Sequence, residues 1–285
     1  WSFISQADAD LFAVADGLEL ANPMSAELSH MRPSLLPGLL AAAMRNVDRG
    51  FGDVALFEIG QEFLAPTPGA QRLAASGVRR GHHAPRRWQG APQPVDGFGA
   101  RADAEAALAA CGVEASSLQV LPPQSSWYHP GRSGILARNP KQPMAAFGEI
   151  HPAVLKHFGL SGPLVAFEVW PQTVPSGNAN KGHARPPLDL SNLQPVRRDF
   201  AFEVASDVAS DILVRAARGA DKKLISEVRV FDVFQGAGLT EGAKSIALEV
   251  TLQPVEATLT DVEIDAVAAK ITASVEKASG GKLRG

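Results

Sequence analysis

Three glutamates are the residues of this sequence best suited by type to acid–base chemistry. Glu58 and Glu62 lie four residues apart in one stretch that alternates apolar and polar residues, and Glu149 lies far downstream. Two carboxylates share the work of proton transfer only when both reach the same substrate group. Nothing in the spacing brings two of the three together, so the carboxylates alone predict no catalytic pair.

The histidines and glycines give no pattern for a metal or a nucleotide. His151 and His157 are six residues apart across a proline, which is not a spacing that zinc ligands use. His82 and His83 are adjacent in a polar segment, where we expect both rings to be solvated. No GxGxxG run, and no GxxxxGK run followed by Ser or Thr, precedes a helical pattern. We therefore predict neither a metal site nor a phosphate-binding loop.

One short run could belong to a substrate cleft. His129–Arg132 (HPGR) directly follows the aromatic pair Trp127 and Tyr128. In a cleft these side chains would bind a substrate, and the protein would then be an enzyme in its own right. A proline and a glycine between histidine and arginine are also typical of a tight turn with a hydrogen-bonded histidine. We favour the turn and keep the autonomous enzyme as an alternative.

A basic pair near position 200 could contact RNA. Arg197 and Arg198 precede Asp199 at the start of an alternating apolar stretch. Guanidinium groups bind phosphates and stack on unpaired bases. An ion-pair cluster on the surface, or a contact to a neighbouring subunit, is an equally good interpretation of the same residues.

A second candidate for RNA contact is the run Phe231–Phe234 (FDVF). Its aromatic rings could stack on a base, and the Asp232 carboxylate could accept hydrogen bonds from a guanine edge. The alternative is a pair of core phenylalanines with an aspartate that caps a turn. For Phe234 we favour the core interpretation.

The composition is that of an ordinary soluble globular protein. Of the 285 residues, 45% are hydrophobic and 20% are charged. No apolar run approaches the roughly 18 to 20 residues of a membrane helix.

The single cysteine, Cys111, excludes an internal disulfide and fits a reducing cytoplasm. A net charge of −3 excludes a protein coated with phosphate-binding residues, so a nucleic-acid contact should be local. The start has no basic-then-apolar signal-peptide pattern. Because the chain begins at Trp1 rather than Met, we expect that a segment upstream has been removed.

Two shifts in composition divide the sequence. Residues 171–187 hold four prolines, two glycines and no apolar period, which predicts a linker. We therefore place a first domain at 1–175, a linker at 176–194 and a second domain at 195–285. The other shift, at 78–98, mixes Arg and His with Gly and Pro. It predicts a long exposed connection inside the first domain.

The first domain mixes helices and strands. A helix with one apolar face is predicted at 36–47, with Ser34 as its N-cap and Pro37 in its first turn. We expect this apolar face to bury itself against partner subunits. The remaining predictions are strands at 54–63, 134–138, 145–150 and 164–170, and helices at 101–111 and 152–157.

The second domain has a cleaner order. Strands are predicted at 200–205, 224–234, 246–252 and 282–285, and helices at 209–217 and 260–275. Thr260 and Glu263 form a capping box at the start of the last helix. The order βαββαβ is the ferredoxin-like arrangement, in which both helices cover one face of the sheet. The predicted fold class is therefore α+β.

The face of the second sheet without helices should carry the binding residues. If Ile246, Leu248, Val250 and Leu252 point toward the helices, then Ser245, Ala247, Glu249 and Thr251 point away. Along 228–234 the phase is ambiguous, because apolar residues occupy both sides. A bulge near Phe231, or an aromatic ring on the uncovered face, would each explain the pattern.

Five runs of the second domain resemble the ferredoxin-fold anticodon-binding domain that ends the β subunits of bacterial phenylalanine–tRNA ligases. They are PVRRDFAFEV (195–204), VRVFDVFQG (228–236), KSIALEVTLQ (244–253), TLTDVEI (258–264) and LRG (283–285). The first domain resembles the class II synthetase-like domain of the same subunit, with an antiparallel sheet and flanking helices. That resemblance is carried by LANPMSAELSHMRPSLLPGLL (20–40), LFEIGQEF (56–63), WYHPGRSGIL (127–136) and FGEIHPAVLKHFGL (147–160).

The resemblance implies a subunit of a cytoplasmic α2β2 ligase. The α subunit would bind phenylalanine, ATP, magnesium and the 3′ end of tRNAPhe, and this fragment would bind no cofactor. A working second class II motif needs an arginine to clamp the ATP phosphate. No arginine directly follows Phe63, and no third motif is found. We therefore expect a degenerate domain without an active site. The family's editing domain and its usual metal-related portion would lie outside this sequence.

The predicted function is a non-catalytic scaffold that also touches the tRNA anticodon region. The predicted tRNA-binding residues are Arg197, Arg198, Asp199, Phe231, Asp232, Ser245 and Arg284. The second domain carries 12 Lys and Arg against 14 Asp and Glu, a net charge of −2, which suits base reading better than unspecific binding. A regulatory module that binds a small molecule is the alternative.

Overall fold

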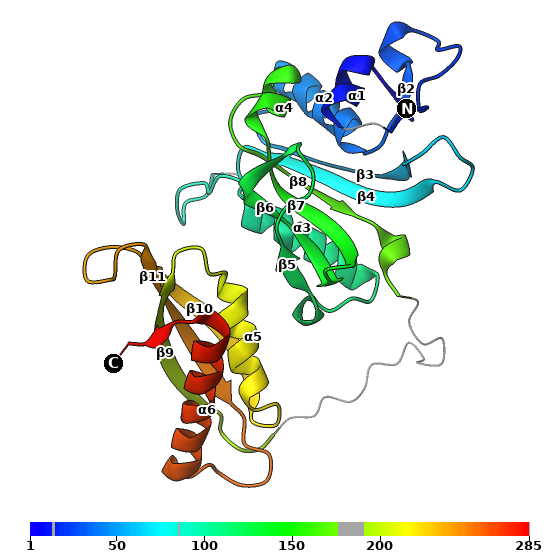
Figure 1. Ribbon diagram of the computed structural model, residues 1–285. Helices are drawn as coiled ribbons and strands as arrows, with labels where there is room; N and C mark the ends of the chain where they lie inside the picture. Colours follow the sequence, from blue (N-terminus) through cyan, green and yellow to red (C-terminus); the bar gives the residue numbers. More distant parts are fainter. Residues whose placement is uncertain (13–14, 85, 176–190, 285) are drawn as a thin grey trace. The chain divides into compact units, whose positions relative to one another are not determined.

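The computed structural model describes residues 1–12, 15–84, 86–175 and 191–284. The chain divides into two compact units, Trp1–Gly182 and His183–Gly285 (Figure 1). Most of the predicted linker, residues 176–190, lies outside the described residues.

The first unit is built on a six-stranded antiparallel sheet. The order across the sheet is β3 (Val54–Phe63), β4 (Gln71–Arg80), β8 (Leu164–Val169), β7 (Gln142–Ile150), β6 (Tyr128–Asn139) and β5 (Gln119–Leu121). A two-stranded sheet, β1 (Phe3–Ile4) with β2 (His30–Met31), lies near the N-terminus. The predicted antiparallel sheet with flanking helices is confirmed.

Helices cover both faces of the central strands of this sheet. On one side lie α2 (Leu36–Asp48), α1 (Gln6–Leu11) and α4 (Pro152–His157), and on the other lies α3 (Gly97–Ala110) (Figure 1). Edge strand β3 is uncovered on its α3 side, where Phe57 and Ile59 are 77% and 63% exposed. Successive residues of β8 show this division: Leu164 belongs to the core under α2, and Val165 belongs to the core under α3. A strand that is buried on both sides reads as a continuous apolar run rather than as an alternation.

The apolar face of α2 is buried inside the first unit itself. Leu36, Leu40 and Ala43 are fully buried in the core that α2 shares with the sheet. The expectation that this face meets partner subunits is therefore wrong. Gly38 and Arg45 lie on the exposed side of the helix. The Ser34 hydroxyl accepts the Leu36 N–H at 3.0 Å, although Leu35 is the N-cap residue.

Strand β4 was not predicted, and its first half falls in a stretch that gave no signal. The predicted exposed connection, 78–98, begins inside this strand, so its first residues belong to the sheet. Small residues in β4 remove the usual sequence pattern of a strand. At Gly77 a small residue is required, because an added Cβ would lie 2.5 Å from the Phe167 ring. Because β4 lies between two other strands and needs small side chains for close packing, it lacks the β-branched pattern of a typical strand.

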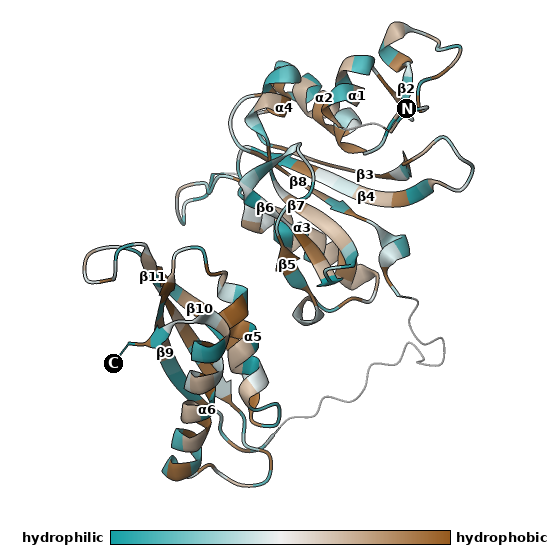
Figure 2. Ribbon diagram, in the orientation of Figure 1, coloured by the Kyte–Doolittle hydropathy of each residue, from teal (hydrophilic) through white to brown (hydrophobic). Residues whose placement is uncertain are grey.

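The second unit has a four-stranded antiparallel sheet with two helices. The order is β10 (Ile225–Phe234), β11 (Ala243–Leu252), β9 (Val196–Ala205) and β12 (Lys282–Leu283), and the helices are α5 (Ser210–Ala220) and α6 (Asp261–Ser279). The predicted order βαββαβ is confirmed. Hydrophilic and hydrophobic residues alternate along these strands, as expected where only one face is covered (Figure 2).

The ends of α6 follow from its sequence. The Thr260 hydroxyl accepts the Glu263 N–H, and the Glu263 carboxylate accepts the Thr260 N–H at 2.8 Å, so the predicted capping box is confirmed. Gly280 ends the helix in the left-handed conformation, with φ of +68°, which glycine adopts without strain. Within the described part of the chain, no helix combines the length and the apolar character needed to cross a lipid bilayer.

Candidate nucleic-acid interface

The pairing register assigns every side chain of the second sheet to one of its two faces. The inward residues of β11, among them Ile246, Leu248 and Val250, are fully buried with α5 and α6. Residues that alternate with them lie on the side without helices, which we call the open face. Directly paired residues of antiparallel strands share a face, so the open face can be followed from strand to strand.

Across β10, β11 and β9 the open face consists of four rows of three residues. They are Glu227, Thr251 and Arg197; Arg229, Glu249 and Asp199; Asp232, Ala247 and Ala201; and Phe234, Ser245 and Glu203. Strand β12 adds Lys282 beside Glu203, and the Arg284 N–H donates to the Ala201 carbonyl at 2.8 Å. At about 6.8 Å between rows, the four rows span roughly 20 Å.

The third and fourth rows bring together the best set of groups for recognising a base. Their centre holds only the methyl groups of Ala247 and Ala201, so nothing large stands over it. Asp232 lies on one side of this centre and Phe234 in the next row, paired with Ser245. Phe234 is 45% exposed. The arrangement offers an exposed ring for stacking and an exposed carboxylate acceptor in neighbouring rows, whereas the predicted Ser245 is only 6% exposed.

A β-bulge settles the phase of β10. The register shifts between Val230 and Asp232, so Phe231 is the extra residue. Val228 and Val230 therefore face the helices, while Asp232 and Phe234 lie on the open face. The sequence left two explanations open, a bulge near Phe231 or an aromatic ring on the uncovered face, and the structure has both. The core assignment of Phe234 is wrong, because the inserted residue turns its ring outward.

The register separates the three consecutive residues at the start of β9. Arg197 is opposite Thr251 and Asp199 is opposite Glu249, so both lie on the open face. Arg198 is opposite the buried Val250 and belongs to the other side, although its side chain is exposed at the strand's end. Arg197 lies in the first row, at the far end of the face from Phe234.

The open face is mixed in charge. Arg229 and Glu249 form an ion pair at 3.1 Å. Hydrogen bonds from the Thr240 hydroxyl and N–H lower the pKa of Glu203, with a smaller contribution from the nearby Arg284 and Lys282. Glu203 therefore remains charged at neutral pH. Acidic groups among the arginines weaken unspecific attraction of phosphates, so this face suits a contact with particular bases.

In the first unit, a buried polar cluster lies on the sheet face that α2 covers. Glu168 is 1% exposed and accepts hydrogen bonds from Ser34 Oγ at 2.5 Å, Tyr128 Oη at 3.1 Å and Trp127 Nε1 at 3.2 Å. Glu62, which is fully buried, accepts from Arg72 Nε at 2.7 Å.

Burial disfavours the ionised form of both carboxyl groups of this cluster. Burial, and then the charge of Glu168, raise the pKa of Glu62 from 4.5 to about 7 against the opposing effect of Arg72. Burial also raises the pKa of Glu168. A closed cluster that holds two carboxyl groups does not fit an anionic nucleotide. These residues therefore support packing rather than chemistry.

The glutamates singled out in the sequence do not meet. Glu58 pairs with Arg32 at 2.7 Å, and Glu149 pairs with Arg132 at 2.6 Å. The carboxyl group that lies near Glu62 is that of Glu168. In the sequence, Glu168 could be noticed only as a charged residue inside the apolar run of β8. The described residues contain no group of three or more His, Cys, Asp and Glu that could hold a metal.

The run His129–Arg132 forms part of β6 and its irregular start. His129 Nδ1 accepts the Gly131 N–H at 3.1 Å, and the Ser133 hydroxyl donates to the His129 carbonyl. This local bonding agrees with the turn that we favoured over a substrate cleft. The pairing of β6 with β7 is interrupted between Tyr128 and Ser133.

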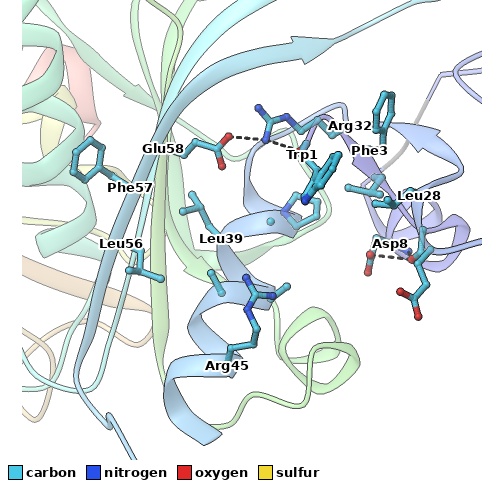
Figure 3. Close-up of a pocket in the computed structure, with 17 residues that line it drawn as sticks. Trp1, Phe3, Asp8, Leu28, Arg32, Leu39, Arg45, Leu56, Phe57 and Glu58 are labelled. Carbon is cyan, nitrogen blue, oxygen red and sulfur yellow. Dashed lines mark hydrogen bonds and ion pairs between the residues drawn. The ribbon is translucent and has the colours of Figure 1, made fainter. Parts of the chain in front are cut away.

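A broad pocket of about 670 Å³ opens between α2, β3 and the N-terminal segment (Figure 3). The Arg32–Glu58 ion pair lies in it, with the ring of Trp1 beside them. Trp1 and Phe57, which line the pocket, are 85% and 77% exposed. The pocket wall from α2 includes Gly38 and Arg45 together with Leu39 from the helix's apolar face.

Comparisons with known proteins find a separate family model for each of the two compact units. Residues 1–170 match the family model described as "Phenylalanyl tRNA synthetase beta chain CLM domain", and residues 191–284 match "Ferredoxin-fold anticodon binding domain". Relatives named phenylalanine–tRNA ligase beta subunit come from Paramagnetospirillum magneticum (50% identical over 286 residues) and Bradyrhizobium diazoefficiens (51% over 289 residues). Each match covers 100% of this chain and 36% of the relative, so the chain spans about a third of the length of the relatives it matches.

Among solved structures, a pyrrolysyl-tRNA synthetase from Desulfitobacterium hafniense is similar with a TM-score of 0.41 and 17% identity. The match covers 60% of this chain and 58% of that one. A likeness of this size is too weak to argue from.

Proposed function

This chain belongs to the phenylalanyl-tRNA synthetase β-chain family, and on that premise we propose that it is the non-catalytic, RNA-contacting part of a phenylalanine–tRNA ligase. The observation that carries the proposal is the open face of the second unit. Phe234, Asp232 and Ser245 occupy adjacent positions there, next to a centre of two alanines. Such a surface takes an unpaired base of the tRNAPhe anticodon region.

Each residue has a role that follows from its chemistry. The Phe234 ring stacks on the base, because a sheet surface can support a splayed nucleotide. The Asp232 carboxylate accepts hydrogen bonds from amino or imino groups of the base. Arg284 and Arg197 reach phosphates from the margins of the face. With a net charge of −2 on the domain, this contact adds selectivity to a tRNA that other parts of the assembly hold.

The first unit serves as a scaffold. Helices cover both faces of the central strands of its sheet, and the two carboxyl groups of Glu62 and Glu168 are buried. The α subunit of a cytoplasmic α2β2 enzyme supplies the aminoacylation site, including ATP and magnesium. The exposed aromatic side chains around the pocket of Figure 3 offer it a surface. This chain alone should therefore catalyse no phenylalanine-dependent exchange of pyrophosphate with ATP.

The proposal is tested by kinetics of the assembled ligase with Phe234→Ala. Loss of one stacked base should lower kcat/KM for tRNAPhe about 10-fold, because base stacking on a ring contributes about 1–3 kcal/mol. Activation of phenylalanine, measured as pyrophosphate exchange without tRNA, should not change. Asp232→Asn should discriminate less well against tRNAs with an altered anticodon base.

Val233→Ala is the matched control. Val233 is paired with the buried Ile246 and so lies off the open face, although it is 52% exposed. Its charging kinetics should equal those of the unmodified enzyme. Unchanged charging by Phe234→Ala would remove the open face from the RNA contact. Titration with a panel of amino acids then decides whether the face takes a small molecule instead.

A further inference from the structure

Between β4 and α3 lies a hairpin, described at residues 81–84 and 86–96, whose base is hydrogen-bonded and packs on the first unit. The His83 N–H donates to the Gln93 carbonyl at 3.0 Å, and the Val95 N–H donates to the Gly81 carbonyl at 2.9 Å. Val95 is 2% exposed and packs in the core under α3. We call this segment the β4–α3 hairpin. Most of this predicted connection is exposed, as expected, but its base is hydrogen-bonded and packed.

The two histidines belong to the base of the hairpin. His82 Nδ1 lies 3.0 Å from Asp53 Oδ1, which also accepts the His82 backbone N–H at 3.0 Å. His83 Nε2 lies 3.6 Å from Asp96, the N-cap residue of α3. Since both rings face acidic groups at the base, they are not the residues that the hairpin presents.

The tip presents a tryptophan. Arg87 and Gly90 form a β-bridge, so Trp88 and Gln89 are the two central residues of the turn. Tight turns favour Gly, Asn, Asp and Ser at such positions, and an indole there gains nothing for the fold. Trp88 is 93% exposed, the largest exposed fraction among the described large hydrophobic side chains. A hairpin with a fixed base and an exposed indole at its tip is suited to binding a partner molecule.

Two arginines flank the indole. The side chains of Arg86 and Arg87 are exposed, and neither has a hydrogen-bond or ion-pair partner among the described residues. Residues 84–94 contain no Asp or Glu, so the tip carries a charge of +2 on a chain whose net charge is −3. A partner for this surface must bring negative charge together with flat, stackable groups. Each nucleotide of an RNA offers both.

We propose that the tip of the β4–α3 hairpin is a second RNA contact, separate from the open face. Arg86 and Arg87 bind the phosphodiester backbone, and Trp88 stacks on an unpaired base. The proposal rests on the proposed function in one respect, namely that the RNA is the tRNA bound by the assembled ligase. The geometry of the tip does not depend on which bases the open face reads.

The test measures tRNAPhe binding by the assembled ligase over a range of salt concentrations. Replacing Arg86 and Arg87 together with Gln should weaken binding about 10-fold and reduce the slope of log K against log salt by roughly 1.5, because two phosphate contacts are lost. Trp88→Ala should weaken binding about 10-fold, and Trp88→Phe should restore most of the loss because the ring remains. Melting temperatures should not change, since these side chains are exposed.

The outcomes separate this proposal from the proposed function. If the unmodified ligase binds tRNAPhe and Phe234→Ala weakens that binding while the hairpin variants do not, only the hairpin proposal fails. If the unmodified ligase does not bind tRNAPhe, both fail. If the hairpin variants lose their α subunit on purification, the tip takes a protein and the proposal is overturned. Losses that add between Trp88→Ala and Phe234→Ala support two separate contacts.

Discussion

The two sheets of this chain differ in how many of their faces are covered, and that difference divides their roles. Helices cover both faces of the central strands of the first sheet, and Glu62 and Glu168 are closed in as a buried cluster. Helices cover one face of the second sheet, and most polar residues of its other face stay in contact with water, although Ser245 is only 6% exposed. Strands with helices on both faces can hold other parts in place, whereas a sheet face without helices can also bind. The same contrast predicts how each unit responds to mutation.

The largest effect should come from removing a core ring of the second unit. Phe202 is fully buried and stacks with Phe200 at 6.3 Å between ring centroids. Phe202→Ala should cost about 3–5 kcal/mol and unfold the second unit. Denaturant unfolding followed by circular dichroism should then show one remaining transition, from the first unit. Loss of both transitions together would break the comparison, because the units would not be independent.

Phe231→Ala is the control for that experiment. Its ring is 51% exposed at the bulge, so the free energy of unfolding should change by about 0.5 kcal/mol or less. A large loss here would mean that the open face contributes to the core.

The next effect concerns the first unit and pH. Folding raises the pKa of Glu62 from 4.5 to about 7 because the carboxyl group is buried beside Glu168. Between these pH values the folded state keeps a proton that the unfolded state has released, so stability falls as pH rises. The loss should be on the order of 3 kcal/mol, complete above about pH 7, and absent below about pH 4.5.

Glu62→Gln should flatten this pH dependence, because the amide does not titrate. Urea unfolding of the first unit at pH 5 and pH 8 measures the difference. Glu58→Gln is the control, since the Glu58 side chain is 36% exposed and pairs with Arg32; it should keep the full slope. An equal slope in Glu62→Gln would mean that another buried group, such as Glu168, holds the proton.

The smallest effect sharpens the comparison within the second unit. Thr260→Ala removes the capping box of α6 and should cost about 1 kcal/mol. Thr258→Ala, two residues earlier and exposed, should cost almost nothing. Because α6 lies on the covered side, neither change should alter tRNA binding at a temperature where the unit is folded. Weaker RNA binding by Thr260→Ala would show that the two faces are coupled.

The sequence predicts the second unit better than the first for a physical reason. Strict alternation in residues 246–252 and the Thr260–Glu263 capping box are local signals, and the structure has both. In the first unit, Met144–Phe147 is buried on both sides and gives no alternation. Strand β4 was missed because packing against Phe167 requires Gly77, which local propensity reads as a break.

The candidate sites were harder to predict, because they depend on contacts between distant residues and on the strand register. Glu62 and Glu168 lie on strands that flank β4, so their proximity depends on a strand that was not predicted. The position of Phe234 depends on one inserted residue, which a periodic pattern cannot locate. The tip of the β4–α3 hairpin was visible in the sequence only as a basic run, because exposure of Trp88 requires the turn to be known.

The bulge in β10 has one more consequence, for how these molecules behave when they are crowded. Strand β10 is an edge of its sheet, and its last residues include the exposed Phe231, Val233 and Phe234. A flat apolar edge of this kind recruits strands from other molecules and begins aggregation. The inserted residue bends and twists the strand, so an incoming chain cannot pair with it over its whole length. The same irregularity that turns a ring outward also protects the protein from polymerising through it.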